Sequence, residues 1–177
     1  MPAERNLFTA NSLQTAVVSD CQQYRYSLGR RWSDGITCLF VMLNPSTADA
    51  TVDDPTIRRC IGFAKREGCG ALEVVNLYAL RATDPKELQR HAAPRGPQSN
   101  QYVARAIAYC DGPIICAWGA DPAARTAQGD MIELIQRAGR IPMCLGTTKA
   151  GMPRHPLYLP KDAPLEVLLP TEPEQKG

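Results

Sequence analysis

The segment LFVMLNPSTAD, residues 39–49, joins an apolar run to an abrupt polar end. Asn44, Pro45 and Ser46 follow directly on the apolar residues 39–43, as is typical of a buried strand that stops at the edge of a sheet. Open parallel sheets bind ligands beyond the carboxyl ends of their strands, so we expect chemistry at this point. Proline fixes its own backbone and biases Asn44 toward an extended conformation, which sets the direction of the carboxamide. The segment therefore predicts a core strand and a candidate site residue.

The composition indicates one globular domain. Of the 177 residues, 44% are hydrophobic and 21% are charged, which is ordinary for a folded soluble protein. We expect a single α/β domain over residues 1–170 and a disordered tail at residues 171–177. The net charge of +2 is too small for nucleic-acid binding through bulk electrostatics, so any affinity for phosphate must come from local basic clusters.

The sequence gives no sign of a membrane or a secreted protein. No apolar run approaches the roughly 20 residues of a membrane span, and residues 1–8 lack the apolar core of a signal peptide. The seven cysteines are scattered without a Cys-x-x-Cys pair, which disfavours a disulfide framework and a zinc or iron–sulfur cage. We therefore predict a cytoplasmic protein without a metal, a cofactor or a membrane partner. The oligomeric state stays open.

Strands alternate with helices along most of the chain. Residues 21–43 predict an antiparallel hairpin that leads into the first core strand. The alternation after this hairpin favours a three-layer α/β/α domain with a mainly parallel, four-stranded central sheet. The expected strands are residues 36–43, 71–78, 113–118 and 141–145, and the expected helices are residues 55–68, 86–91, 100–110 and 121–138.

Polar residues follow three of the four predicted core strands. Asn44 follows the first strand, Asn76 and Tyr78 lie at the end of the second, and His155 lies in the long polar loop after the fourth. Because the carboxyl ends of parallel strands meet at one edge of a sheet, we expect these side chains to converge. Their convergence is a stronger indication of a site than any one of them.

Two resemblances accompany this pattern. The runs MLNPSTAD (42–49), DPTIRRC (54–60) and VNLYALRATDP (75–85) closely resemble bacterial and phage proteins grouped as domain-of-unknown-function family 1643, which has no settled activity. More distantly, residues 42–46 resemble the strand end Gly-hydrophobic-Asn-Pro-Gly of the uracil-DNA glycosylase superfamily. Residues 154–157, RHPL, are similar to that superfamily's His-Pro-Ser motif.

The second resemblance implies a uracil-DNA glycosylase-like fold and a DNA glycosylase-like hydrolase active in DNA repair. In that superfamily the Asn matched by Asn44 orients the attacking water, and the His matched by His155 hydrogen-bonds the departing base. A polar residue after the second strand, here Asn76, can read the base edge. Ser46 replaces the usual Gly and Leu157 replaces the usual Ser, and the iron–sulfur cysteines of some branches are absent.

These residue types suit the cleavage of an N-glycosidic bond, which passes through an oxocarbenium-like state with negative charge on the leaving base. The reaction needs a group that orients water and a donor for the developing anion. A carboxylate near the site would favour the cationic sugar or act as base. The predicted catalytic residues are Asn44, His155, Asp49 and Asp53; the predicted base- or ligand-binding residues are Pro45, Ser46, Asn76, Tyr78, Trp118 and Leu157; Lys149 and Arg154 are predicted to bind phosphate.

Each of these features also has a simpler interpretation. Asn44 can be a turn residue, Asp54 the N-cap of the next helix, and Tyr78 and Trp118 core aromatics. The partner would be nucleic acid, DNA rather than RNA, or a nucleobase or nucleotide. The changes at Ser46 and Leu157 also allow a non-catalytic module that binds a nucleotide or nucleic acid with the same fold. A third hypothesis is a metal-dependent hydrolase that uses Asp49, Asp53, Asp54 and His155.

Overall fold

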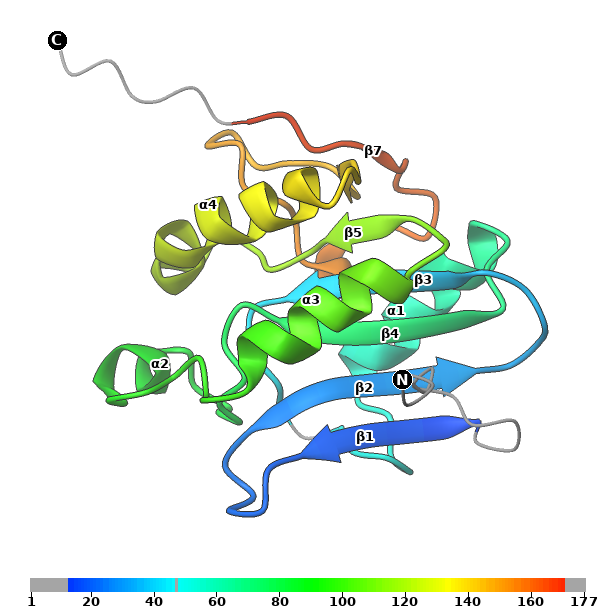
Figure 1. The fold of residues 1–177 in the computed structure, drawn as a ribbon. Helices are drawn as coiled ribbons and strands as arrows, with labels where there is room; N and C mark the ends of the chain where they lie inside the picture. The colour runs from blue at the N-terminus through cyan, green and yellow to red at the C-terminus, as the bar shows by residue number, and fades with distance from the viewer. Residues whose placement is uncertain (1–12, 47, 171–177) are drawn as a thin grey trace, which may run out of the picture.

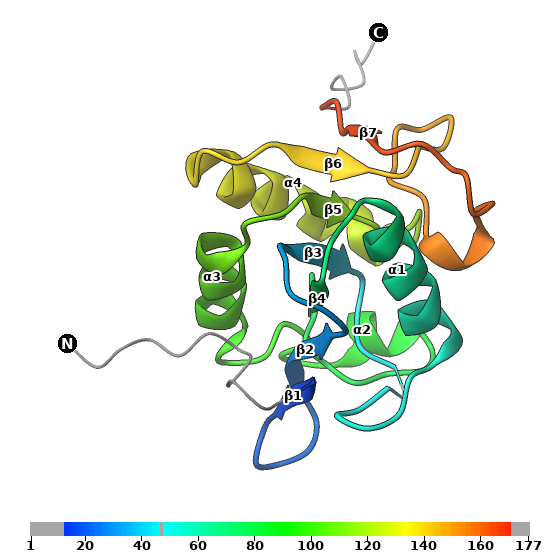
Figure 2. The same ribbon diagram turned by 90° about the vertical axis from the view of Figure 1, so that its right-hand side faces the viewer.

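A computed structural model describes residues 13–46 and 48–170. The chain forms a mixed sheet of seven strands in the order β1-β2-β4-β3-β5-β6-β7 (Figure 1 and Figure 2). Three of the strand pairs are parallel, β3 with β4, β3 with β5 and β5 with β6, and the outer pairs are antiparallel. The strands are β1 (Gln14–Val18), β2 (Arg25–Arg31), β3 (Thr37–Met42), β4 (Ala71–Asn76), β5 (Ile114–Cys116), β6 (Pro142–Cys144) and β7 (Glu166–Val167).

Helices cover both faces of the sheet (Figure 2). On one face, α1 packs against Phe40 and Val74; on the other, α3 and α4 pack against Val41 and Val75. The central strands β3 and β4 are therefore apolar on both sides, as the sequence of a strand between two helical layers requires. The helices are α1 (Pro55–Arg66), α2 (Lys86–Arg90), α3 (Ser99–Tyr109), α4 (Pro122–Arg137) and the short 3₁₀ helix η1 (Pro156–Tyr158).

Local sequence explains where the two best-defined helices begin. Asp54 caps α1 by accepting from the backbone N–H of Ile57, and Asp121 caps α4 by accepting from the N–H of Ala123. A proline follows each cap in the first turn, where its missing N–H costs nothing. Both helices follow a parallel strand, so both N-termini lie at the edge of the sheet where β3, β4, β5 and β6 end.

The α/β class and the sequence of strands and helices from residue 37 to residue 144 agree with expectation. The four-stranded sheet was an underestimate, because β1, β2 and β7 extend the sheet on both sides. The predicted antiparallel hairpin before the first core strand is present, but β1 and β2 form it, so it begins at residue 14 and not at residue 21. Strand β2 forms its hairpin with β1 and lies antiparallel to β4, so it does not pair with β3. The hydrogen bonds that decide this come from β4, which is remote in sequence.

No helix among the described residues has the length and apolar character that a membrane crossing requires. The tail expected at residues 171–177 lies outside the described residues.

Candidate functional site

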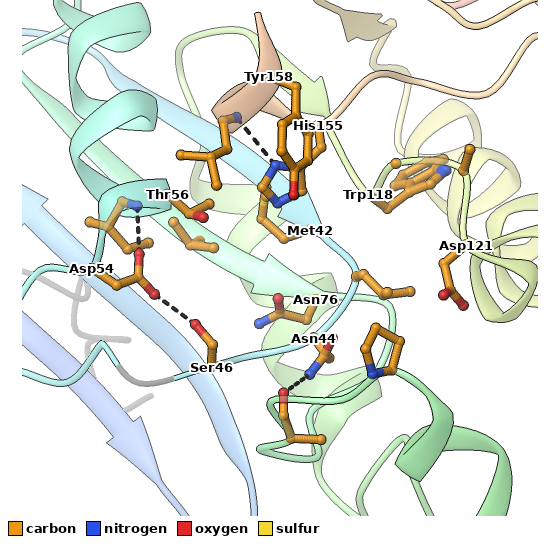
Figure 3. A pocket seen from close by; sticks show the side chains of 18 of the residues that line it. Met42, Asn44, Ser46, Asp54, Thr56, Asn76, Trp118, Asp121, His155 and Tyr158 are labelled. Atoms are coloured by element: carbon orange, nitrogen blue, oxygen red, sulfur yellow. Dashed lines mark hydrogen bonds between the residues drawn. The ribbon is translucent and has the colours of Figure 1, made fainter.

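A pocket of about 700 Å³ opens beyond the carboxyl ends of the parallel strands β3, β4, β5 and β6. Figure 3 shows Asn44 and Asn76 on one side of this pocket and His155 and Tyr158 opposite them, with Asp54 and Asp121 at its two flanks. The volume is within the usual range for a small-molecule site. The polar and aromatic side chains that line it are Arg25, Asn44, Ser46, Asp54, Thr56, Asn76, Thr83, Trp118, Asp121, Thr148, Arg154, His155 and Tyr158.

Asn44 is fixed by hydrogen bonds from its own amide nitrogen. Nδ2 donates to the carbonyl oxygen of Ala82 at 2.7 Å and to that of Pro45 at 3.0 Å. Both amide hydrogens are thus engaged by backbone, and Oδ1 has no hydrogen-bond donor among the described residues. The side chain lines the pocket, so its remaining capacity there is that of an acceptor.

Asn76, the last residue of β4, is the most unusual polar residue of the pocket. It is only 3% exposed, and neither Oδ1 nor Nδ2 has a hydrogen-bond partner in the described part of the chain. Leaving a buried polar group unpaired costs about 1–3 kcal/mol. An unpaired carboxamide in the lining of a pocket needs an explanation, and a ligand that both donates and accepts hydrogen bonds would supply one.

His155 lines the pocket, and one of its two ring nitrogens, Nδ1, forms a hydrogen bond within the protein. Nδ1 accepts from the backbone N–H of Leu157 at 3.2 Å, which assigns the proton of the neutral imidazole to Nε2. Burial lowers the pKa of His155 from its ordinary value, and the carboxylate of Asp54 only partly opposes this effect. The ring is therefore neutral near pH 7, and Nε2–H is a hydrogen-bond donor at the pocket.

Asp54 contributes a carboxylate to the pocket, and its charge acts on His155. Oδ1 accepts from the N–H of Ile57 at 2.8 Å as the helix cap, and Oδ2 accepts from the hydroxyl of Ser46 at 2.7 Å. Each carboxylate oxygen has two acceptor positions, so both can accept a further hydrogen bond. Capping and a role in the pocket are thus compatible in one residue.

The structure brings seven of the sequence-predicted residues to the pocket: Asn44, Ser46, Asn76, Trp118, Arg154, His155 and Leu157. It does not bring Asp49 or Asp53 there. Asp49 uses its carboxylate to accept from the N–H groups of Thr51 and Val52, and Asp53 pairs with Arg30 at 2.7 Å. Both carboxylates therefore organise the loop before α1, and Asp54 takes their place at the pocket.

The three remaining predicted residues, Pro45, Tyr78 and Lys149, do not line the pocket. Pro45 is buried, and its carbonyl oxygen accepts hydrogen bonds from Asn44 and from the N–H of Ala82. Tyr78 lies outside the lining and donates its hydroxyl to the carbonyl oxygen of Ala123 at 2.8 Å. Lys149 is exposed and does not line the pocket.

Trp118 lines the pocket but is only 1% exposed, and its N–H donates to Gln128. Tyr158, 77% exposed, presents much more aromatic surface and lies with its ring centroid 5.5 Å from that of His155. For stacking against a planar ligand, Tyr158 therefore has the better position.

The metal-dependent alternative finds no support in the side-chain arrangement. Within residues 13–46 and 48–170, no three His, Cys, Asp or Glu side chains come together in a way that could hold a metal ion. The separate partners of Asp49, Asp53 and Asp54 explain why these neighbours in sequence do not converge.

The profile of a family described as "Protein of unknown function (DUF1643)" matches residues 25–157. The chain belongs to this family. No curated protein and no solved structure matches the chain. The DUF1643 region begins at Arg25 and ends at Leu157, both of which line the pocket, and of the lining residues it leaves out Tyr158 alone. The pocket is thus built almost entirely from the region that defines the DUF1643 family.

Sequence reasoning missed Arg25, Asp121 and Tyr158 as pocket residues. Asp121 could have been found, because a helix that follows a parallel strand begins at the ligand-binding edge of the sheet. Arg25 could not, because its strand joins the sheet through non-local pairing with β4.

Proposed function

We propose that this DUF1643 chain is an N-glycosidic hydrolase of the DNA glycosylase type, which releases a modified or deaminated base from its sugar. A relationship of its fold to the uracil-DNA glycosylase superfamily is part of the proposal. The observation that carries it is Asn76, a buried carboxamide without hydrogen-bond partners on the wall of a pocket. A nucleobase edge offers adjacent donor and acceptor groups, which a carboxamide can match with two hydrogen bonds.

In the proposed complex the Asn76 carboxamide rotates toward the base edge. The base enters from an unstacked nucleotide and packs against Tyr158, whose ring is largely exposed. Leu157 and Ser46 shape the wall around it.

The reaction would proceed by attack of water on the anomeric carbon of the sugar. Asn44 Oδ1 accepts a hydrogen bond from this water and orients it, because the amide nitrogen of Asn44 is already held by Ala82 and Pro45. Asp54 accepts the proton that the water loses and its charge favours the cationic sugar. The bond between carbon and base nitrogen breaks, and the base leaves as an anion.

The anion is stabilised by His155. With Nδ1 occupied by the N–H of Leu157, Nε2–H donates to the oxygen or nitrogen on which the negative charge develops. A neutral imidazole serves this role without protonating the base prematurely, and the lowered pKa keeps it neutral. The base anion then takes up a proton from solvent and Asp54 releases its proton, so the products are a free base and an abasic sugar.

The experiment is an abasic-site assay with purified protein. Oligonucleotides that carry uracil, hypoxanthine, xanthine or alkylated bases, single- and double-stranded, are incubated and then cleaved with alkali. Strand cleavage at the modified base with wild-type protein, and cleavage slowed about 100-fold or more with Asn44→Ala, is the expected result. Absence of cleavage with every substrate would argue against the proposed activity.

A non-catalytic binding module is the second candidate, and two hydrogen bonds to Asp54 favour it. Both oxygens of Asp54 already accept hydrogen bonds, from Ile57 and Ser46, and these bonds weaken a carboxylate as a base. Calorimetric binding of a nucleoside or oligonucleotide without release of base would support this module over the hydrolase.

A further inference from the structure

Strand β2 carries two equally buried arginines that differ in how well their charges are compensated. Arg25 and Arg30 are each 3% exposed. Arg30 is fully engaged: Nε donates to Asp53 at 2.7 Å, Nη1 to the carbonyl oxygen of Gly29, and Nη2 to that of Asp49. Its charge is balanced by a carboxylate, as is usual for a buried guanidinium.

Arg25 lacks this compensation. Nη1 donates to the carbonyl oxygen of Ala48, whereas Nε is buried without a partner, and Arg25 forms no ion pair with any residue that the structure describes. Burial lowers its pKa to about 10, so the group still carries a full positive charge at neutral pH. Unlike Arg30, Arg25 lines the pocket.

A bulge in β2 turns Arg25 toward the pocket side of the sheet. The register changes from Val17 opposite Ser27 to Val18 opposite Arg25, so Tyr26 is an extra residue. Tyr26 packs on the face covered by α3, where its ring stacks on that of Tyr102 at 5.1 Å. The side chain of Arg25 then lies on the opposite face, against Ala48 of the loop that precedes α1. Bulges are a recurrent means of redirecting a side chain at a site.

Among the carboxylates, that of Asp54 raises the pKa of Arg25 most. The two oxygens of this carboxylate accept hydrogen bonds from Ser46 and Ile57 and not from Arg25. If Arg25 served only to hold the loop before α1 in place, its hydrogen bond to Ala48 would be sufficient. Asp54 and Asp49 act on the charge of Arg25 only through space, and neither forms an ion pair with it, so its Nε remains available to an anion in the pocket. Phosphate suits Arg25 best, because a guanidinium offers several donors in a planar fork that matches phosphate oxygens.

We infer that the pocket holds a phosphate group of its ligand against Arg25. This inference rests on the proposed function for the rest of the ligand, a base and its sugar. The burial of Arg25 narrows the proposed substrate to a nucleotide with a terminal phosphate, because a phosphate within a polymer must leave room for chain on both sides. Base release is therefore assayed with 5′-mononucleotides as well as with oligonucleotides. A pocket of about 700 Å³ has space for a mononucleotide.

The test uses wild-type protein and the N–H resonances of arginine Nε in a nitrogen–hydrogen correlation spectrum. Inorganic phosphate, a 5′-mononucleotide, the matching nucleoside and a short single-stranded oligonucleotide are titrated in turn. We expect the Arg25 signal to shift saturably with phosphate and with the mononucleotide and to stay in place with the nucleoside. Arg30 is the internal control, because its Nε is already bonded to Asp53. A saturable shift with the oligonucleotide but not the mononucleotide would assign the phosphate to a polymer.

Two variants complete the test. Arg25→Lys keeps a positive charge, and Arg25→Gln removes it while keeping a donor for Ala48. Binding of the mononucleotide should weaken about tenfold to a hundredfold in Arg25→Gln and less in Arg25→Lys. An unmoved Arg25 signal at saturating mononucleotide, or a shift that only follows ionic strength, would overturn the inference. If the protein releases base from a nucleoside while the Arg25 signal does not shift, the proposed hydrolase stands and this inference fails. If phosphate shifts the Arg25 signal but no base is released, this inference stands and the proposed hydrolase fails.

Discussion

The carboxamide of Asn44 and the backbone carbonyl of Ala82 are joined by a hydrogen bond of 2.7 Å across 38 residues of sequence. This bond ties the loop after β3 to the loop after β4, at the edge where parallel strands present their carboxyl ends. It also decides what Asn44 can do, because an amide nitrogen that donates to backbone leaves the oxygen for a water molecule.

Replacement of Asn44 by alanine should therefore affect activity far more than stability. The lost hydrogen bond to Ala82 is worth about 1 kcal/mol in the free energy of unfolding. Loss of a group that orients the reacting water should lower the rate of base release by about 100-fold or more. Denaturant unfolding and single-turnover base release measure the two effects on the same preparation. A variant with wild-type turnover would remove Asn44 from the reaction.

Asp54 and Asp49 offer a matched pair of variants. Asp54→Asn keeps the helix cap, since Asn and Asp cap equally well, but removes the negative charge from the pocket. We expect base release to fall about 100-fold to 10,000-fold with little change in Tm. Asp49→Asn retains an acceptor for Thr51 and Val52, so its activity should stay within about twofold of wild type. If Asp49→Asn lowered base release more than Asp54→Asn did, Asp49 and not Asp54 would be the catalytic carboxylate.

The lowered pKa of His155 predicts a pH dependence of stability. The ordinary value is 6.5, and burial lowers it in the folded state. Well above pH 6.5 the ring is neutral in both states and contributes no pH dependence. As the pH falls below 6.5, the unfolded chain takes up the proton first, so the folded state loses stability until the pH passes the folded pKa.

Urea unfolding from pH 8 to pH 5 should show this loss in wild-type protein. In His155→Gln the loss over the same range should be smaller, because this contribution is absent. Equal slopes for the two proteins would mean that His155 titrates normally. The same protonation places a hydrogen on Nδ1 and breaks its bond with the N–H of Leu157, so base release should also decline toward pH 5.

Tyr158 should contribute to ligand binding without contributing to stability. Its ring is 77% exposed beside the pocket, so Tyr158→Ala removes a stacking surface and little packing. Stacking of a base on an aromatic ring is worth about 1–3 kcal/mol, which predicts a roughly fivefold to 150-fold rise in Kd. Tyr109→Ala, on α3, is a control for loss of an exposed tyrosine elsewhere. Similar effects of the two variants on Kd, measured by calorimetry, would contradict stacking at Tyr158.

Sequence patterns predicted the interior of the fold well because the residues concerned carry local signals. Val41 and Val75 lie in continuous apolar runs, and Pro55 and Pro122 mark helix starts. The edge strands carry weaker signals. Strand β7 has two residues, both exposed, and the place of β2 beside β4 depends on partners 40 or more residues away.

The candidate site was predictable in part for the same reason. Asn44, Asn76 and His155 follow core strands, so their meeting at one pocket could be expected from the direction of the sheet. The choice among Asp49, Asp53 and Asp54 could not, because it depends on which carboxylate meets Arg30 and which caps α1. Arg25 owes its position to a bulge that the sequence does not mark.

The substitution Asn76→Leu is the sharpest test of the proposed function. We propose that the buried Asn76 carboxamide is kept without partners for a base that enters the pocket. Replacement by an apolar side chain of similar size should then raise the free energy of unfolding by about 1–3 kcal/mol, while base binding and release are lost. A variant that is less stable than wild type and still binds and releases base would show that the carboxamide serves the fold and not a ligand.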